Sequence, residues 1–547
     1  MDNQFSCADI NFGGISRPDK TYTERTIEPI HTGLPKEVMS ICPECKKVIQ
    51  AVEFEEDGKV IMKKTCPEHG EFRDIIYSDA ELFKQLETWP YIDKRGFKNP
   101  IVKNAKNCPD YCGLCDRHLS NTMLVNIDLT NRCNLRCPVC FANANVKGYV
   151  YEPSFEQVVE MLKTFRNQKP VPAQFVQFSG GEPTIYPEFL NVLRVSKELG
   201  YTHIQIATNG IKMANLEFAE KCKEAGLHTL YLQFDGINDN VSLSLRNRKL
   251  WEIKLKCVEN VRKTDMKIVL VPTIVKGIND SQIGDIVRFA IDNEDIITGI
   301  SFQPVAFTGR ISREQREKQR FTLADLAHAV EEQTGFAKAR EDWFPLSSIS
   351  AFSAFGASIL GREVLTVSCH PLCGLCTYFF IDKKTKKPVP ITRFLNLKQL
   401  FIDLYKESEK LSSRKVKLFT MVRFLYYAKK YFNKEKAPAG LTPKLFLETL
   451  NGYIDKKYSR TKKYKKHNFP SFFVAGMHFQ DSYNYDLDRI RRCVIHYGAP
   501  NGRIYPFCTY NSGPVYRDYI EKKFSKPLKK VVKKKEKVEP ECVLPEF

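Results

Sequence analysis

Three cysteines with the spacing of an iron–sulfur ligand set stand in the stretch Leu129–Ala144, LTNRCNLRCPVCFANA. Cys133, Cys137 and Cys140 are spaced C-x3-C-x2-C, so one short loop can place three thiolates around a single cubane cluster. Four thiolates complete a cubane, and three therefore leave one iron open to a ligand that is not protein. Zinc is the alternative metal, but zinc sites favour paired C-x2-C elements and closed four-coordination.

A glycine-rich motif, SGGEPT, follows at Ser179–Thr184. Gly180 and Gly181 allow the backbone to approach a ligand closely, and the Glu182 carboxylate can accept a hydrogen bond from an ammonium group. Pro183 completes the sequence GGEP. Taken alone, the same residues also suit an ordinary turn between a strand and a helix.

Together the two motifs resemble those of the radical S-adenosylmethionine (SAM) enzymes. In that family the amino and carboxylate groups of SAM chelate the open iron, and an electron from the cluster cleaves SAM to methionine and a 5′-deoxyadenosyl radical. The GGEP motif contacts the amino group of SAM. The resemblance therefore implies that Cys133, Cys137 and Cys140 hold the catalytic [4Fe–4S] cluster and that Gly180–Pro183 bind SAM.

Apolar runs that alternate with amphipathic helical patterns position these motifs, and this order predicts a parallel βα fold between residues 122 and 305. Six strands with their crossovers fit a partial (β/α)6 barrel, in which functional groups gather at the carboxyl ends of the strands. The cysteine loop follows the first strand and GGEP follows the second. The six expected strands are 123–130, 174–180, 203–209, 229–235, 267–274 and 299–305.

Polar residues also end the third and fourth strands. Thr208 and Asn209 end the third, and Asp235 ends the fourth. In radical SAM enzymes such strand ends line the SAM pocket, so the resemblance implies cofactor contacts here. Turn chemistry, with Asn and Asp capping a loop, is the alternative for each residue.

A small β module is expected near the N-terminus, where CPEC and CPEHG contain Cys42, Cys45 and Cys66. A module of this size cannot bury enough surface to be stable alone, so a metal is expected to hold it together. Zinc and a rubredoxin-like mononuclear iron are both compatible with these residues. The fourth ligand is either His69 or a cysteine from 108–115.

The remaining clustered cysteines also indicate metal, because a reducing compartment disfavours disulfides among the 18 cysteines. The C-x3-C-x2-C spacing recurs twice, and a looser pair follows near the C-terminus. An auxiliary iron–sulfur cluster suits the second repeat, completed by one of the late pair, with structural zinc as the alternative. The residues concerned are Cys108, Cys112, Cys115, Cys369, Cys373, Cys376, Cys493 and Cys508.

Composition indicates a globular protein, since 43% of the 547 residues are hydrophobic and 12% are aromatic. No apolar run spans a membrane and no secretory signal is visible, so we expect a cytoplasmic location, with peripheral membrane association. The net charge of +20 indicates an anionic partner.

The expected architecture is α/β, with the partial radical SAM barrel between two metal-binding regions. The predicted segments are an N-terminal cysteine-rich metal module, the barrel, a helical auxiliary-cluster and substrate domain, and a lysine-rich tail. Their bounds are 1–121, 122–305, 306–520 and 521–547.

The order CPEC, CPEHG, CPDYCGLC, CNLRCPVC and CHPLCGLC resembles an archaeal group of radical SAM proteins that includes the tetraether lipid synthases. This resemblance implies two auxiliary [4Fe–4S] clusters, a rubredoxin-like iron and a reductant such as a ferredoxin. It also implies an archaeal phospholipid substrate whose terminal methyl carbons are coupled. A cluster on Cys369, Cys373 and Cys376 would hold the first carbon radical, and the basic, aromatic segment at 393–435 would line an apolar tunnel near the membrane surface.

Two other functions compete with lipid coupling. Proteins of the same group have been linked to methylation of a pterin precursor of methanopterin, which would require a flat polar pocket instead of a lipid tunnel. A basic, metal-stapled nucleic-acid binder or electron carrier is the third hypothesis. The GGEP motif on the expected strand argues against it, so no nucleic acid partner is expected.

Overall fold

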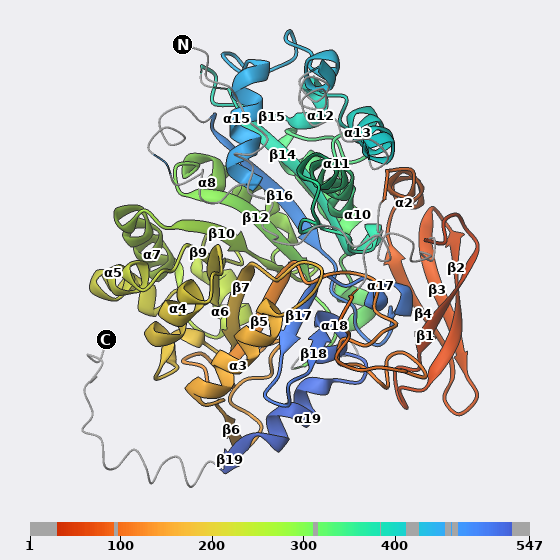
Figure 1. The fold of residues 1–547 in the computed structure, drawn as a ribbon, viewed down its shortest axis with the longest axis vertical. Coiled ribbons are helices and arrows are strands. Elements are labelled where there is room, and N and C mark those ends of the chain that lie inside the picture. Colours follow the sequence, from red (N-terminus) through yellow and green to blue (C-terminus); the bar gives the residue numbers. More distant parts are fainter. Residues whose placement is uncertain are drawn as a thin grey trace.

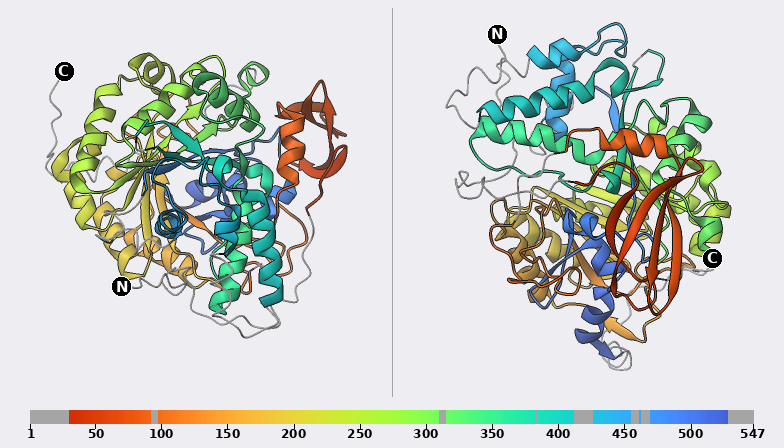
Figure 2. Two further views of the ribbon diagram at one scale, coloured as in Figure 1. Left: turned by 90° about the horizontal axis from the view of Figure 1, so that it is seen from above. Right: turned by 90° about the vertical axis from the view of Figure 1, so that its right-hand side faces the viewer.

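The computed structural model describes residues 30–91, 97–309, 315–382, 384–411, 426–454, 461 and 469–527. A large mixed sheet runs through the centre of the molecule, and a four-stranded sheet lies at one side (Figures 1 and 2). Most of the lysine-rich tail, Cys7, Cys542 and the centre of the basic, aromatic segment lie outside the described residues.

The six predicted barrel strands are present and pair in parallel, in chain order, across the central sheet. A short strand, β11 (Thr273–Ile274), continues beside the last of them. The predicted partial barrel is therefore confirmed. Its strands are β5 (Leu124–Thr130), β7 (Phe175–Gly180), β8 (His203–Thr208), β9 (Thr229–Gln233), β10 (Lys267–Val271) and β12 (Ile297–Pro304).

Strands from the C-terminal part of the chain extend both edges of this sheet. β16 (Ser471–Met477) pairs in parallel with β12, and β17 (Ile495–Gly498) pairs in parallel with β5. Antiparallel strands complete the edges (Figure 1). These are β13 (Phe344–Pro345), β14 (Gly374–Ile381), β15 (Pro388–Pro390) and β18 (Ile504–Pro506).

Helices cover the outer face of the barrel strands (Figure 1). The first of these helices is capped at Ser154, where Ser154 and Gln157 form a reciprocal capping box. The covering helices are α3 (Phe155–Arg166), α4 (Phe189–Glu198), α5 (Leu216–Glu224), α6 (Asp239–Arg246), α7 (Trp251–Thr264) and α8 (Ile283–Asp292).

Residues alternate along each barrel strand between this helical layer and the interior of the barrel. On β8, Ile204 and Ile206 are fully buried in the outer core, whereas Gln205 lines an internal cavity. On β9, Leu230 is buried outward and Tyr231 lines the same cavity. Polar side chains therefore line much of the inner face on β8 and β9, whereas β10 contributes Val269 and Val271.

The N-terminal module is an antiparallel sheet followed by one helix. Its elements are β1 (Lys36–Ile41), β2 (Val48–Glu56), β3 (Lys59–Cys66), β4 (Gly70–Tyr77) and α2 (Ala80–Glu87). The module is fixed to the barrel by Arg320, whose buried guanidinium donates to Asp74 and, at 2.7 Å, to Asp481. Asp481 also accepts the Phe307 N–H at 3.1 Å, just after β12.

The region after the barrel contains the predicted helices, of which α11, α13 and α15 share a second apolar core. Tyr427 and Phe432, from the described end of the basic, aromatic segment, pack against that core. No helix among the described residues is both long and apolar enough to cross a membrane. The main helices are α10 (Leu323–Thr334), α11 (Ser350–Leu360), α13 (Leu397–Leu411), α15 (Pro443–Ile454) and α19 (Tyr516–Lys523).

The short elements join these layers. They are β6 (Tyr149–Tyr151), α9 (Arg316–Gln319), α12 (Ile391–Phe394), α17 (Leu487–Arg491), α18 (Phe507–Asn511), β19 (Ser525–Pro527) and several single-turn 3-10 helices.

Candidate functional site

A cavity of about 890 Å3 lies inside the barrel, and the predicted motifs meet at it. Several predicted residues line it, whereas Pro183 and Asp235 are buried behind the lining. Motifs far apart in the sequence thus share one site. The lining residues from the predicted set near the barrel strand ends are Cys133, Cys137, Cys140, Gly180, Gly181, Glu182, Thr208 and Asn209.

The cysteine loop is held in shape by Asn145. The Asn145 side chain accepts from the Cys133 N–H at 2.9 Å and donates to the Cys133 and Leu135 carbonyls at 2.8 and 2.9 Å. Backbone N–H groups already point at two of the sulfurs, Leu135 N to Cys133 Sγ at 3.4 Å and Ala144 N to Cys140 Sγ at 3.5 Å. Such N–H···S bonds stabilise the thiolates of an iron–sulfur cluster.

The two glycines of GGEP are required by the cysteine loop, not by a ligand alone. A Cβ on Gly181 would lie 2.0 Å from the Arg132 carbonyl oxygen, and one on Gly180 would lie 2.3 Å from that of Thr130. Glycine permits this contact, in which Gly181 N donates to Thr130 O at 2.7 Å and Glu182 N donates to Arg132 O at 2.9 Å.

Glu182 connects the ends of β7 and β8. Its Oε1 accepts from the Thr184 and Thr208 hydroxyls at 2.6 and 2.8 Å, and its Oε2 accepts from Asn209 N at 2.8 Å. Burial raises the pKa of Glu182, although these hydrogen bonds lower it. Because an ionised carboxylate has about four acceptor sites, Oε2 retains capacity for an ammonium donor.

Asn209 and Asp235 act on the cysteine loop through neighbours. Asn209 Nδ2 donates to Asn134 Oδ1 at 2.7 Å. Asp235 forms a bidentate ion pair with Arg246, with N···O distances of 2.7 and 2.8 Å, and Arg246 donates to the Val139 carbonyl at 2.8 Å. Burial would lower the pKa of Arg246, but the Asp235 carboxylate raises it above its usual value. No local sequence pattern distinguishes Arg246, so its contact with the cysteine loop was not predicted.

The donor set of this loop fits a cluster. Burial raises the pKa of the Cys133 thiol to about 12 and raises that of Cys137, so without a cation these sulfurs would remain protonated. Iron bound by the thiolates would offset that cost, and the three sulfurs face one cavity from a single loop.

Eight further cysteines form two groups beside the barrel. Five line the main cavity: Cys369, Cys373, Cys376, Cys493 and Cys508. Three surround a smaller cavity: Cys108, Cys112 and Cys115. In contrast, Cys222 and Cys257 are fully buried in the barrel's apolar core, as their helical periodicity predicts.

The N-terminal ligand set is closed by His69. The ligand atoms of Cys42, Cys45, Cys66 and His69 lie within 4.8 Å of one another. The Cys45 and Cys66 sulfurs are 3.8 Å apart, and Cys66 Sγ lies 3.5 Å from His69 Nδ1. A zinc tetrahedron with Zn–S of 2.3 Å requires a sulfur separation of about 3.8 Å. The Cys3His set therefore fits zinc. His69, and not a cysteine from 108–115, is the fourth ligand.

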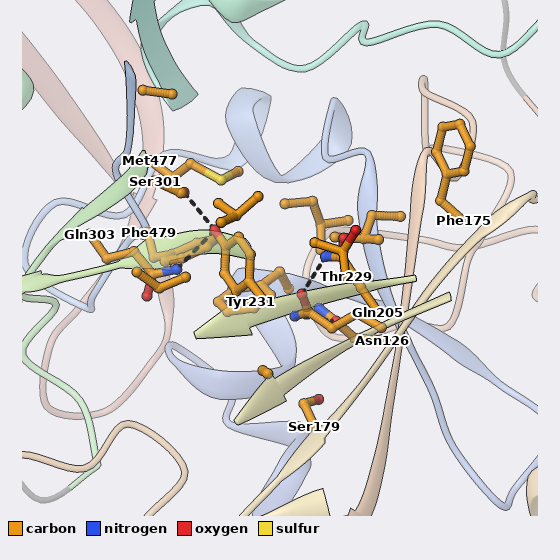
Figure 3. Close-up of a pocket in the computed structure, with 18 of the residues that line it drawn as sticks. Asn126, Phe175, Ser179, Gln205, Thr229, Tyr231, Ser301, Gln303, Met477 and Phe479 are labelled. Carbon is orange, nitrogen blue, oxygen red and sulfur yellow. Dashed lines mark hydrogen bonds between the residues drawn. The ribbon is translucent and has the colours of Figure 1, made fainter. Parts of the chain in front are cut away.

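Polar residues project from the middle of the strands into the cavity, and these were not predicted from the sequence. They include Asn126 on β5, Gln205 on β8 and Tyr231 on β9, and the Tyr231 hydroxyl donates to Ser301 Oγ at 2.5 Å (Figure 3). Gln303 donates to the same hydroxyl at 3.3 Å. The alternation of inward polar and outward apolar residues in HIQIAT (203–208) and TLYLQ (229–233) could have identified them.

Apolar residues also line the cavity. They include Phe473 and Met477 from β16, with Leu346 and Phe352 from the segment before β14. The cavity thus offers both hydrogen-bonding groups and apolar surface. This combination suits a flat heterocycle with a polar edge.

Two family models match the chain. The radical SAM superfamily model matches residues 127–290. The model described as the HMPTM N-terminal zinc ribbon domain matches residues 34–78.

Similar proteins include a 7,8-dihydro-6-hydroxymethylpterin dimethyltransferase of Methanocaldococcus jannaschii, which is 42% identical over 498 residues, 90% of this chain and 96% of that protein. A GTP 3′,8-cyclase of Clostridium acetobutylicum is 26% identical over 270 residues, 48% of this chain and 79% of that protein. The solved structure of Streptococcus suis SuiB bound to S-adenosylmethionine has a TM-score of 0.32 and 23% identity, covering 40% of this chain and 45% of that one.

The similarity to the pterin dimethyltransferase overturns the expected tetraether lipid synthase. Lipid coupling, an archaeal phospholipid partner, a membrane surface and a radical-holding role for the cluster on Cys369, Cys373 and Cys376 were wrong expectations. The physical reason lies in the barrel interior, because an alkyl chain offers no acceptor to the buried Asn126 Nδ2, which has no partner among the described residues.

We predict that Cys66→Ser abolishes zinc binding by the N-terminal module. A serine hydroxyl does not replace a thiolate, and structural zinc contributes roughly 10–16 kcal/mol to small modules. Metal analysis of the purified protein should show one zinc per chain in the wild type and none in the variant, with faster proteolysis within 34–78. Cys222→Ala, in the barrel core, should keep its zinc. Equal zinc contents in all three proteins would contradict the assignment.

We predict that Asp235→Asn destabilises the protein by about 3–5 kcal/mol, because the buried Arg246 charge would lose its partner. Denaturant unfolding measures this difference. The matched control is Asp295→Asn. Asp295 forms an ion pair with Arg262 and is about half exposed, so its loss should cost less than about 1 kcal/mol. Similar losses in both variants would show that the Asp235–Arg246 pair has no special role.

Proposed function

Because this chain belongs to the family of the 7,8-dihydro-6-hydroxymethylpterin dimethyltransferases, we propose that it methylates 7,8-dihydro-6-hydroxymethylpterin. As a radical SAM enzyme it uses a [4Fe–4S] cluster and SAM. The observation that carries the proposal is the 42% identity over nearly the full length of both chains. The relative's name supplies the substrate and the transfer of two methyl groups.

The cavity supports this substrate over a lipid. Amide and hydroxyl side chains on β5, β8 and β9 can bind the edge of a pterin, and the apolar residues of β16 can contact its faces. Alkyl chains could contact the apolar residues of the cavity, but they would leave the buried Asn126 Nδ2 without an acceptor. Methylation of a pterin precursor was the alternative function that was expected to require a flat polar pocket.

The proposed cofactor contacts follow from the strand ends. Cys133, Cys137 and Cys140 hold the cluster, while Gly180–Pro183 and the ends of β8 and β9 form the SAM pocket. When bound, the cluster and SAM supply a 5′-deoxyadenosyl radical. The protein's own contribution is to position these groups. Glu182 Oε2 accepts from the Asn209 N–H, Asn209 contacts the cysteine loop through Asn134, and Asp235 positions Arg246 against that loop.

We further propose that the eight remaining clustered cysteines hold two auxiliary [4Fe–4S] clusters. With His69 closing the N-terminal zinc site, two cubanes need eight thiolates, and eight clustered cysteines remain among the described residues. Three of the eight lie around the smaller cavity, so one of the five in the main cavity must complete their cluster.

Turnover tests the proposed function directly. The anaerobic, reduced protein is given SAM in excess, as the radical source, together with a one-carbon donor, which is either further SAM or a methyl- or methylene-tetrahydropterin. It should release 5′-deoxyadenosine and convert 7,8-dihydro-6-hydroxymethylpterin to singly and then doubly methylated products, seen by mass spectrometry. Cys137→Ala should abolish both, because a cluster with two remaining ligands on the loop is not retained. Cys222→Ala is the control and should retain both. Release of 5′-deoxyadenosine with an unmethylated pterin would contradict the function.

Iron analysis tests the auxiliary clusters separately. We predict that Cys373→Ala loses the iron of one four-iron cluster while Cys257→Ala, in the apolar core of the barrel, loses none. Electron paramagnetic resonance of the reduced Cys373→Ala protein should still show the cluster held by the three-cysteine loop. An iron content equal to that of the wild type would exclude Cys373 from the cluster ligands.

A further inference from the structure

Three amide side chains cross the inner face of the barrel at one level. Asn126 on β5, Gln177 on β7 and Gln205 on β8 are direct register partners. Gln205 Nε2 donates to Gln177 Oε1 at 2.6 Å, and Gln177 Nε2 donates to Asn126 Oδ1 at 3.0 Å. We name Asn126, Gln177 and Gln205 the amide row.

The amide row lines the main cavity, where barrels more often place Val, Ile and Leu. Its neighbours on the same strands, such as Ile127 and Ile204, are fully buried in the outer core, so the polarity is confined to the inner face. An apolar occupant would remove water from these three amides without replacing its hydrogen bonds, and this desolvation costs free energy. An occupant that hydrogen-bonds to them avoids this cost.

The hydrogen bonds of the row have one direction. His203 Nε2 lies 3.2 Å from Gln205 Oε1 at one end, and each amide nitrogen donates to the next amide oxygen. The last nitrogen, Asn126 Nδ2, has no acceptor among the described residues, although Asn126 is only 1% exposed. An unpaired buried donor costs about 1–3 kcal/mol, so its acceptor is expected in the ligand.

The row also offers acceptors. Asn126 Oδ1 and Gln177 Oε1 each accept one hydrogen bond within the row, and an amide oxygen has two lone pairs. The row therefore presents one donor followed by two acceptors. The pyrimidinone edge of a pterin presents the complement, a ring carbonyl followed by a ring N–H and an amino group.

We propose that the amide row binds the pyrimidinone edge of the pterin, an inference that rests on the proposed function. Asn126 Nδ2 donates to the ring carbonyl, Asn126 Oδ1 accepts from the ring N–H, and Gln177 Oε1 accepts from the amino group. Gln205 positions Gln177 and does not itself contact the ring.

This orientation agrees with the position of the cysteine loop. Asn126 precedes Thr130, the end of β5, by four residues, which corresponds to about 13 Å along a strand. The pyrimidinone edge would lie deep in the barrel, and the opposite edge of the pterin, with its hydroxymethyl group, would face the strand ends. Tyr231, fixed by Ser301 and Gln303, lies between these levels on the neighbouring strand (Figure 3).

A double-mutant cycle between protein and ligand tests the proposal. The probes are 7,8-dihydro-6-hydroxymethylpterin and its analogue without the amino group, bound to anaerobic, SAM-loaded holoprotein and followed by pterin fluorescence. In the wild type, loss of the amino group should weaken binding about tenfold, the effect of about one hydrogen bond. In Gln177→Met the two probes should bind with nearly equal Kd, because the partner of the amino group is absent.

The controls separate contact from damage to the fold. Gln85→Met, on the exposed surface of α2, should keep the tenfold difference between probes, and the SAM affinity of Gln177→Met should match the wild type. Asn126→Leu should weaken both probes equally, because each retains the carbonyl. A tenfold preference retained in Gln177→Met overturns the role of the row while leaving the function intact. A wild type that cleaves SAM but binds neither probe overturns the proposed function itself.

Discussion

The site depends on a backbone contact that only glycine allows. Gly180 and Gly181 lie so close to the carbonyls of Thr130 and Arg132 that no side chain fits between them. This contact joins the end of β7 to the start of the cysteine loop. From there Glu182 joins the end of β8, and the Asp235–Arg246 pair joins the end of β9 to Val139. The loop is thus held by four neighbouring strands, so the cluster ligands occupy a defined position over the barrel.

The sequence was sufficient for the local features of the fold. Apolar runs and the amphipathic patterns between them located the six barrel strands. The added strands β16 and β17 were not predicted, because their place in the sheet depends on pairing with β12 and β5, which are far away in the chain. The fourth metal ligand, His69, was left among alternatives for the same reason: only the folded β module brings it to the cysteines.

The order of the cysteine motifs led to the wrong substrate, a phospholipid. Cysteine spacing reports which clusters a chain can hold, and it carries no information on what fills the cavity beside them. That information lies in single inward-facing residues such as Asn126, Gln177 and Gln205, which were treated as parts of apolar strands. The basic, aromatic segment suggested a lipid tunnel, yet Tyr427 and Phe432 from its described part pack against the helical core, and Tyr426 is exposed.

The central claim is that the barrel cavity is built for a pterin and not for alkyl chains, and equilibrium binding measures this most directly. The anaerobic, SAM-loaded protein can be titrated with 7,8-dihydro-6-hydroxymethylpterin and, in parallel, with vesicles of archaeal phospholipid. The account predicts saturable binding of one pterin per chain and no competition by the vesicles. Displacement of the pterin by phospholipid, or phospholipid binding without pterin binding, would contradict it.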